Sequence, residues 1–166
     1  MSTVLDVRDL LDSPGSSRKV RVDEAVAGLA TQLALVPEDR HVEGSLLLES
    51  VTDGILVTGR VSGVMTMACA RCLKSFDQTF DLDVQELFVP GAQPDDDEYP
   101  VDDGHIDLEP MIRDAVILSM PFAPTCRPDC RGLCPRCGGD RNLGECSCSE
   151  DVDLRWAPLS DLKLTD

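Results

Sequence analysis

The sequence contains few aromatic residues and few histidines, and both shortages restrict the chemistry open to it. Aromatic side chains make up 4% of the 166 residues, with one tryptophan and one tyrosine. A surface that stacks many unpaired bases on aromatic rings is therefore not expected. His41 and Glu43 have the H-x-E spacing, but no P-C-x-x-C motif accompanies them, neither His41 nor His105 stands in H-E-x-x-H, and no serine stands in G-x-S-x-G. These absences argue against nucleophilic and deaminase chemistry, and we expect both histidines to lie at the surface.

The chain also lacks a basic leader, long apolar runs and a glycine-rich phosphate loop. Its first residues include neither a basic n-region nor an apolar h-region. Its apolar runs fall far short of the roughly 18 residues needed to span a bilayer. We therefore expect a cytoplasmic protein with no membrane contact, no small-molecule substrate and no enzymatic activity.

Basic residues are scarce, and their distribution limits nucleic-acid binding. There are 15 Lys and Arg against 31 Asp and Glu, which gives a net charge of −16 and repulsion from a phosphate backbone. Residues 77–109 contain acidic but no basic side chains, which predicts a solvated face or a contact with a basic partner. Residues 54–76 contain no acid. The candidate contacts to RNA or to a partner are Arg60, Arg71, Lys74, Arg131, Arg136 and Arg141.

The apolar pattern predicts strands in the first half of the chain. Residues 42–51, 55–67 and 75–88 are rich in β-branched and apolar side chains, and Asp53-Gly54 is a strong hairpin signal. Residues 18–22 also favour a short strand, whereas residues 24–36 place apolar side chains at the spacing of a weak helix. Residues 90–105 combine proline, glycine and acid, so we expect a solvated loop there.

Residues 107–119 predict the clearest helix. Asp107 suits the N-cap, Pro110 is tolerated in a first turn, and Glu109 can pair with Arg113. We therefore predict an α+β fold, with an antiparallel β-meander or partly closed barrel, this helix packed on it, and a C-terminal zinc knuckle. Residues 1–125 would form the α+β domain and residues 126–166 a cysteine-rich segment, with one docked turn near Trp156.

Eight cysteines in a chain without an export signal favour metal binding or catalysis over disulfides. Residues 134–139 read C-P-R-C-G-G, in which the glycine after the second cysteine can take a left-handed conformation and free backbone N–H groups toward sulfur. Cys146 and Cys148 follow after a short loop. Cys134, Cys137, Cys146 and Cys148 therefore predict one closed, structural zinc site.

Four cysteines remain, in a C-x-x-C pair and a C-x-x-x-C pair. Cys69 and Cys72 could join Cys126 and Cys130 in a second site that ties the predicted sheet to the C-terminal segment. Metal-free buried thiols, a redox pair, and iron in place of zinc at the knuckle remain alternatives.

Several motifs together resemble the YceD family of large ribosomal RNA subunit accumulation proteins, in its cysteine-rich Gram-positive form. The matching segments are C-A-R-C-L at 69–73, I-D-L at 106–108, D-A-V-I-L-S-M-P at 114–121, G-L-C-P-R-C-G at 132–138, N-L at 142–143 and D-L-K at 161–163, with Cys126, Cys130, Cys146 and Cys148.

The resemblance implies a non-enzymatic role in the accumulation, processing or stability of 23S ribosomal RNA. It also supports pairing Cys69 and Cys72 with Cys126 and Cys130, because some relatives lack the knuckle but keep the other two pairs. The chain would bind either the RNA of the large-subunit precursor or a basic ribosomal protein or assembly factor. Alternatives from other classes are a zinc-ribbon adaptor in transcription and a thiol redox protein.

Overall fold

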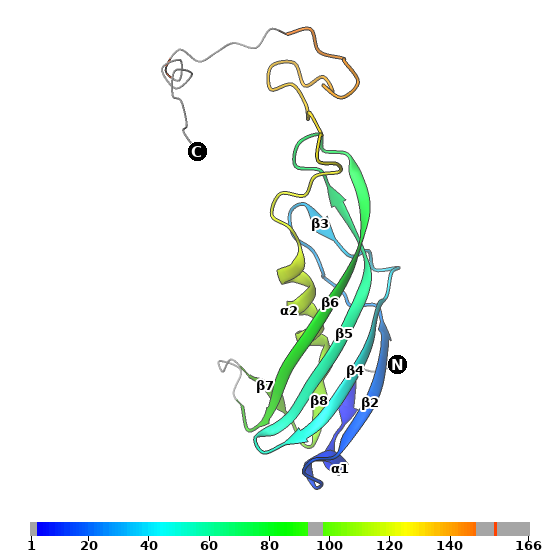
Figure 1. The fold of residues 1–166 in the computed structure, drawn as a ribbon, viewed down its shortest axis with the longest axis vertical. Helices are drawn as coiled ribbons and strands as arrows, with labels where there is room; N and C mark the ends of the chain where they lie inside the picture. The colour runs from blue at the N-terminus through cyan, green and yellow to red at the C-terminus, as the bar shows by residue number, and fades with distance from the viewer. Residues whose placement is uncertain (1–2, 93–97, 149–154, 156–166) are drawn as a thin grey trace, which may run out of the picture.

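The computed structural model describes residues 3–92, 98–148 and 155, and its main feature is a long, curved sheet. Its longest strands, residues 42–51, 54–68 and 75–90, run side by side along the sheet (Figure 1). Shorter elements lie at the base and along the side of the sheet. In chain order the elements are β1 (Val4–Asp6), α1 (Arg8–Leu11), β2 (Ser17–Glu24), β3 (Ala34–Leu35), β4 (Val42–Val51), β5 (Gly54–Ala68), β6 (Ser75–Pro90), β7 (Tyr99–Val101), β8 (His105–Asp107) and α2 (Leu108–Ser119).

The predicted strands 42–51, 55–67 and 75–88 are confirmed as β4, β5 and β6, which pair antiparallel. The predicted hairpin joins β4 to β5 through a two-residue turn, Thr52 and Asp53, with Val51 paired to Gly54. Gly54 has φ +153°, and a side chain there would place its Cβ 2.0 Å from the Phe88 carbonyl oxygen. Glycine is therefore required where β5 begins beside β6.

The predicted antiparallel meander is present as β4, β5 and β6, but the whole sheet is mixed and open, which corrects the alternative of a partly closed barrel. Its strands follow the order β2-β4-β5-β6-β7, with β3 added on β5, and the path does not close on itself within the described residues. The pairing of β6 with β7 is parallel. Strands β1 and β8 form a separate two-stranded sheet. The molecule is thus mostly β, with two short helices in its described part.

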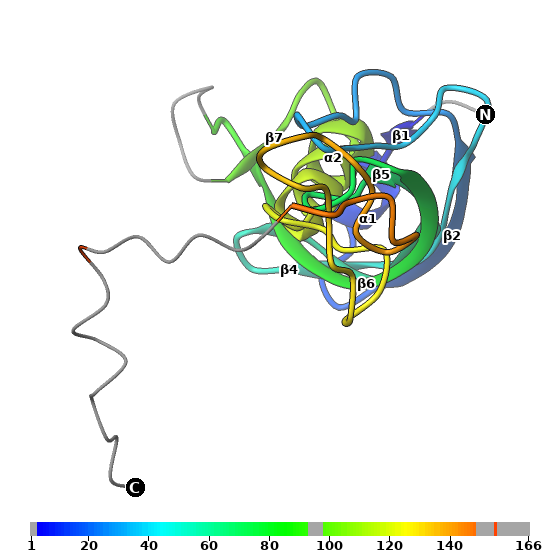
Figure 2. The ribbon, with the colours of Figure 1, turned by 90° about the horizontal axis from the view of Figure 1, so that it is seen from above.

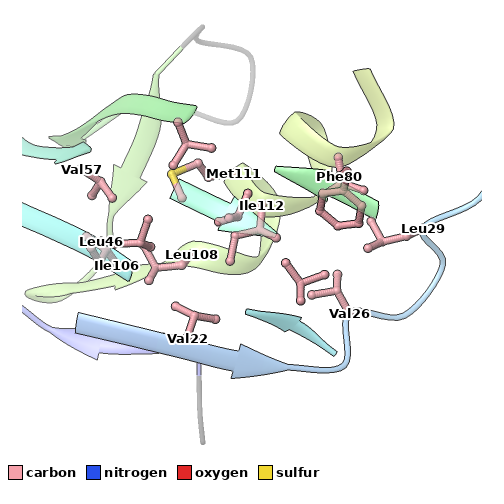
Figure 3. Packing of buried hydrophobic residues seen from close by; sticks show 14 of the residues in the cluster. Val22, Val26, Leu29, Leu46, Val57, Phe80, Ile106, Leu108, Met111 and Ile112 are labelled. Atoms are coloured by element: carbon pink, nitrogen blue, oxygen red, sulfur yellow. The ribbon is translucent and has the colours of Figure 1, made fainter. Parts of the chain in front are cut away.

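The predicted packing helix is confirmed as α2, which lies in the hollow of the curved sheet (Figure 2). The Asp107 carboxylate caps it by accepting a hydrogen bond from the Glu109 backbone N–H, and Arg113 pairs with Glu109 as predicted. Its buried side chains meet the inner face of the sheet (Figure 3). They are Leu108, Met111, Ile112 and Val116. Neither helix in the described part of the chain is long and apolar enough to cross a membrane.

The weak helix predicted over residues 24–36 is wrong. Gly28 has φ +72°, and the segment forms turns that end in the short strand β3. Four of its apolar residues, Val26, Leu29, Ala34 and Val36, are still buried, because they pack into the core from an irregular backbone, as seen for Val26 and Leu29 in Figure 3. Tertiary burial therefore overrides the helical spacing here.

The solvated loop predicted over residues 90–105 contains an unexpected strand. Residues 99–101 form β7 beside β6, and the Tyr99 ring stacks on Phe88 with centroids 5.3 Å apart. The tyrosine hydroxyl donates to the Asp114 carboxylate on α2 at 2.8 Å. One aromatic contact thus fixes part of this acidic segment to the body. The docked turn expected near Trp156 lies outside the described residues.

Candidate metal centres

The structure gathers the eight cysteines into two groups of four. Within each group the sulfur atoms lie within 4.8 Å of one another, and all eight thiols are free of disulfides. We call the first group the tip tetrad, because it sits at the turn between β5 and β6. The second is the knuckle tetrad. The tip tetrad is Cys69, Cys72, Cys126 and Cys130, and the knuckle tetrad is Cys134, Cys137, Cys146 and Cys148.

The sulfur spacing of the tip tetrad fits a tetrahedral metal ion. The Sγ atoms of Cys69 and Cys130 lie 3.8 Å apart, and those of Cys72 and Cys126 lie 3.7 Å apart. Zinc bound to thiolates at about 2.3 Å requires tetrahedral sulfur separations of about 3.8 Å. Both groups have the four-sulfur composition of closed structural zinc sites. The predicted sets are thus brought together, and their loading with zinc remains a prediction.

The turn of the tip tetrad forms a zinc-knuckle backbone directly after β5. The Leu73 N–H donates to the Cys69 carbonyl at 2.8 Å, and the Cys69 N–H donates to the Lys74 carbonyl at 3.0 Å. Leu73 adopts φ +60°, a left-handed conformation that is costly for a residue with a side chain. This turn aims the thiols of Cys69 and Cys72 at one point, and Phe76 packs beside them.

The knuckle tetrad repeats the same turn at residues 134–139. The Gly138 N–H donates to the Cys134 carbonyl at 2.8 Å, and the Cys134 N–H donates to the Gly139 carbonyl at 2.9 Å. Gly138 takes φ +72°, which confirms the left-handed conformation predicted for it. Cys146 and Cys148 complete the group from the following loop.

Each tetrad contains one thiol with a lowered pKa and two with a raised pKa, which are Cys72 and Cys126 in the tip tetrad and Cys146 and Cys148 in the knuckle tetrad. Burial acts to raise the pKa of Cys69, but backbone N–H groups, led by that of Cys126, outweigh it and lower this pKa to about 6. Backbone N–H groups, led by that of Cys137, lower the pKa of Cys134 to about 6. Burial raises the pKa of Cys126 to about 12, and the neighbouring Cys137 thiol raises that of Cys148 to about 12. A divalent cation would remove the repulsion between neighbouring thiolates and favour the deprotonation of all four.

The C-terminal segment is joined to the tip of the sheet by backbone hydrogen bonds. The Ala70 N–H donates to the Pro124 carbonyl at 2.7 Å, and the Leu133 N–H donates to the Arg71 carbonyl at 2.9 Å. Gly132, at φ +71°, allows this approach, because a Cβ there would lie 2.7 Å from the Arg71 oxygen. The tetrads are therefore held at one end of the molecule, beyond the sheet (Figure 1).

Two residues that the sequence did not single out as site residues lie between the tetrads. The Asp140 side chain is 7% exposed and its carboxylate lies 2.7 Å from the Lys74 ammonium. Lys74 first, and Asn142 next, hold the pKa of Asp140 down to about 2 by hydrogen bonding to its carboxylate. Asn142 also donates from Nδ2 to the Cys130 sulfur at 3.7 Å. The sequence carries no signal for this link, because the burial of Asp140 and its approach to Lys74 are seen only in the folded chain.

The basic residues predicted to contact RNA or a partner are largely engaged within the protein. Arg60 pairs with Asp81 and Asp83 at 3.2 and 2.9 Å. Lys74 pairs with Asp140, and the Arg71 guanidinium donates to the Cys130 carbonyl at 3.0 Å. The Arg131, Arg136 and Arg141 side chains are on exposed residues of the cysteine-rich segment. No contact role for the six residues follows from their positions alone, so it stays a prediction.

Comparison with known proteins gives a consistent set of relatives. The profile described as "Large ribosomal RNA subunit accumulation protein YceD" matches residues 57–163. An uncharacterized protein of Mycobacterium tuberculosis is 38% identical over 142 residues, covering 82% of this chain and 69% of the relative. The uncharacterized protein YlbN of Bacillus subtilis is 30% identical over 111 residues, covering 64% of each chain.

A plant protein carries the family name in full. "Large ribosomal RNA subunit accumulation protein YCED homolog 1, chloroplastic" of Arabidopsis thaliana is 33% identical over 66 residues, which cover 39% of this chain and 21% of the plant protein. No solved structure shows a significant match. The profile match spans both tetrads and most of the sheet, and the chain belongs to the YceD family, as its motifs predicted.

Proposed function

We propose that this chain is a non-enzymatic cytoplasmic factor in the accumulation of the large ribosomal subunit, and that it binds a basic protein of the precursor. The family is named for large ribosomal RNA subunit accumulation and is not known as a family of enzymes. The sequence left two possible binding partners, RNA or a basic protein. The charges of the described surface favour the basic protein.

The observation that carries this choice is the pairing of the basic side chains. Arg60 stands in the middle of the sheet face but faces two carboxylates, so its immediate surroundings remain negative. Lys74 is held by a buried carboxylate and cannot approach a phosphate without breaking that ion pair. RNA binding gains free energy when exposed cations of the protein displace counterions from the phosphates. Arg60 and Lys74 are held in ion pairs within the protein, so they contribute little to this release.

Beside these paired cations, the described surface exposes acidic and apolar side chains. Asp77, Asp81 and Asp83 follow one another along the outer face of β6, next to β5. Asp77 pairs with Arg40, and Asp81 and Asp83 share Arg60, so this row keeps a net negative charge. At the end of α2, Leu118 is 85% exposed and Phe122 is fully exposed, beside a groove of about 530 Å³. Exposed apolar side chains of this size mark protein contacts, and the carboxylates supply the charge that a basic protein would meet.

The tetrads suit a structural part in this function. Four sulfur ligands leave no open position for a substrate, so a metal held there would order the tip of the molecule. Neither described histidine is part of a tetrad. His41 pairs with Asp23 of β2, and His105 of β8 lies beside Asp6 of β1. These contacts support binding over turnover.

The test is retention of partners by the tagged full chain, with and without ribonuclease treatment of the lysate. A protein-held factor keeps a large-subunit protein after the RNA is digested, and neutralising the outer row with Asp81→Asn and Asp83→Asn lowers that retention. The matched control is Lys19→Gln with Arg21→Gln, which alters exposed cations on the edge strand β2, separated from β6 by β4 and β5. Loss of all partners on ribonuclease treatment, or sensitivity to the control alone, would favour direct RNA contact. Recovery of RNA polymerase instead would favour the transcription adaptor.

A further inference from the structure

Asp140 and Asn142 are placed to do more than shape the turn between Gly139 and Cys146. The Asp140 backbone forms an isolated antiparallel bridge with Leu133, the residue before the first cysteine of the knuckle tetrad. Its carbonyl accepts from the backbone N–H groups of Leu143 and Glu145 at 3.1 and 3.2 Å. The backbone of Asp140 therefore sets the loop that delivers the last two cysteines of the knuckle tetrad.

The Asp140 side chain reaches in the other direction, toward the tip tetrad. Its Oδ2 lies 2.7 Å from the Nζ of Lys74, which follows Cys72 by two positions. Its Oδ1 accepts from the backbone N–H and from the Nδ2 of Asn142 at 2.9 and 2.7 Å. One buried carboxylate thus connects the turn of the tip tetrad to the loop of the knuckle tetrad.

Asn142 completes the connection at the sulfur atoms. Its Nδ2 lies 3.7 Å from the Cys130 Sγ, the donor position of an outer-sphere hydrogen bond to a thiolate. Its Oδ1 accepts from the Arg131 backbone N–H and from the Arg127 guanidinium, both at 2.8 Å. Asn142 therefore belongs to the knuckle loop by sequence and to the surroundings of the tip tetrad by contact.

We propose that Asp140 and Asn142 are positioning residues that couple the two cysteine tetrads, so that metal bound at either tetrad tightens metal binding at the other. If the knuckle loop loses its order, Asn142 leaves Cys130 and Asp140 leaves Lys74, and the tip tetrad loses both supports. Through the same contacts, metal binding at the tip tetrad would hold the knuckle loop in order. Thermodynamic linkage requires the coupling to be equal in both directions. The inference concerns the metal centres and does not depend on which partner the protein binds.

The experiment measures zinc affinity separately at each tetrad of the full chain. Zinc is withdrawn with a graded chelator series, and cysteine protection from alkylation is read by peptide mass spectrometry at Cys72 and at Cys137. In otherwise unaltered protein, Cys148→Ser should weaken zinc binding at the tip tetrad by about tenfold, the size of a lost outer-sphere contact. In a chain that also carries Asn142→Leu, Cys148→Ser should shift the tip tetrad by less than about twofold, because the link is already gone.

Two further variants separate coupling from loss of folding. Lys74→Met lies outside the knuckle loop and removes the ion pair to Asp140 together with a positive charge near Cys72 and Glu145. Weaker zinc binding at Cys137 in this variant is therefore the readout of coupling. Asp53→Asn is the matched control, because Asp53 is an exposed carboxylate in the turn between β4 and β5, at the opposite end of β5 from the tip tetrad. The proposal fails if Cys148→Ser leaves the tip tetrad unchanged, or if its effect is as large with Asn142→Leu as without it.

Discussion

The two tetrads begin with the same turn but build it from different residues. In both, the residue after the second cysteine is left-handed and donates its N–H to the carbonyl of the first cysteine. At the knuckle tetrad this residue is Gly138, which takes the conformation without strain. At the tip tetrad it is Leu73, whose side chain is exposed and offers no burial in return. The left-handed conformation that brings the thiols together is therefore present at the tip tetrad even though it is unfavourable for leucine.

The tetrads differ more in what they join. Cys69 and Cys130 are 61 positions apart, so the tip tetrad connects the end of β5 with the chain beyond α2. The knuckle tetrad lies within residues 134–148 and closes a short loop. A cross-link over a long loop removes more entropy from the unfolded chain than one over a short loop. Metal bound at the tip tetrad would therefore stabilise the whole domain, whereas metal bound at the knuckle tetrad would order a local segment.

The largest expected effect comes from breaking the tip tetrad. Cys72→Ser and Cys137→Ser should each remove about one zinc ion per chain, but Cys72→Ser should lower the free energy of unfolding of the sheet by about 1 kcal/mol more. The difference follows from loop-closure entropy, which grows with the logarithm of loop length. Native mass spectrometry gives the metal content, and chemical denaturation followed by far-ultraviolet circular dichroism gives the stability of the sheet.

Serine replacement also tests whether the tetrads differ in role at all. The matched pair keeps the change of atom the same, sulfur to oxygen at the second cysteine of each turn. Equal losses of sheet stability in the two variants would contradict the distinction between a domain-wide and a local cross-link. Unchanged metal content in either variant would contradict the assignment of that tetrad.

The long strands and α2 could be predicted because local signals and burial agree there. Strands β4 to β6 alternate or run apolar between clear turn residues, and Asp107 caps α2. The segment around Leu29 could not be predicted, because its helical spacing fills a space under the sheet that only the assembled fold defines. β7 was missed for a related reason: a three-residue strand in an acidic segment depends on the Tyr99 contact with Phe88.

The site was predictable to the level of ligand groups and no further. The C-x-x-C-G-G pattern predicted the turn at residues 134–139, and the left-handed conformation of Gly138 confirms this prediction. The sequence placed Cys69 and Cys72 between two predicted strands, but it did not indicate the left-handed conformation of Leu73, because leucine seldom takes it. The roles of Asp140 and Asn142 were beyond sequence reasoning, since they arise from contact between segments about 70 positions apart, as in the pair Lys74 and Asp140.

A smaller effect should follow from exchanging the left-handed residues. Gly138→Leu should weaken zinc binding at the knuckle tetrad by about tenfold, because a left-handed residue with a side chain costs about 1–2 kcal/mol. A Cβ at Gly138 would meet no atom within 4 Å, so the loss would report backbone strain without a clash. Leu73→Gly should change stability by less than about 1 kcal/mol, because relief of strain is offset by the greater entropy of glycine in the unfolded chain. Unchanged zinc affinity at the knuckle tetrad in Gly138→Leu would show that the turn does not depend on the left-handed conformation.

The smallest difference is expected between the two ionised thiols. The pKa values of Cys69 and Cys134 are both lowered to about 6, so in metal-free protein both should be thiolates at pH 7 and should react faster than an ordinary cysteine. Because only the thiolate attacks, alkylation of each should slow about tenfold per unit as the pH falls below about 6. Cys69 is fully buried and Cys134 is slightly exposed, so Cys134 should react first at every pH. Peptide mass spectrometry after brief iodoacetamide treatment resolves the two, and faster labelling of Cys69 would show that the tip of the sheet opens more readily than the knuckle.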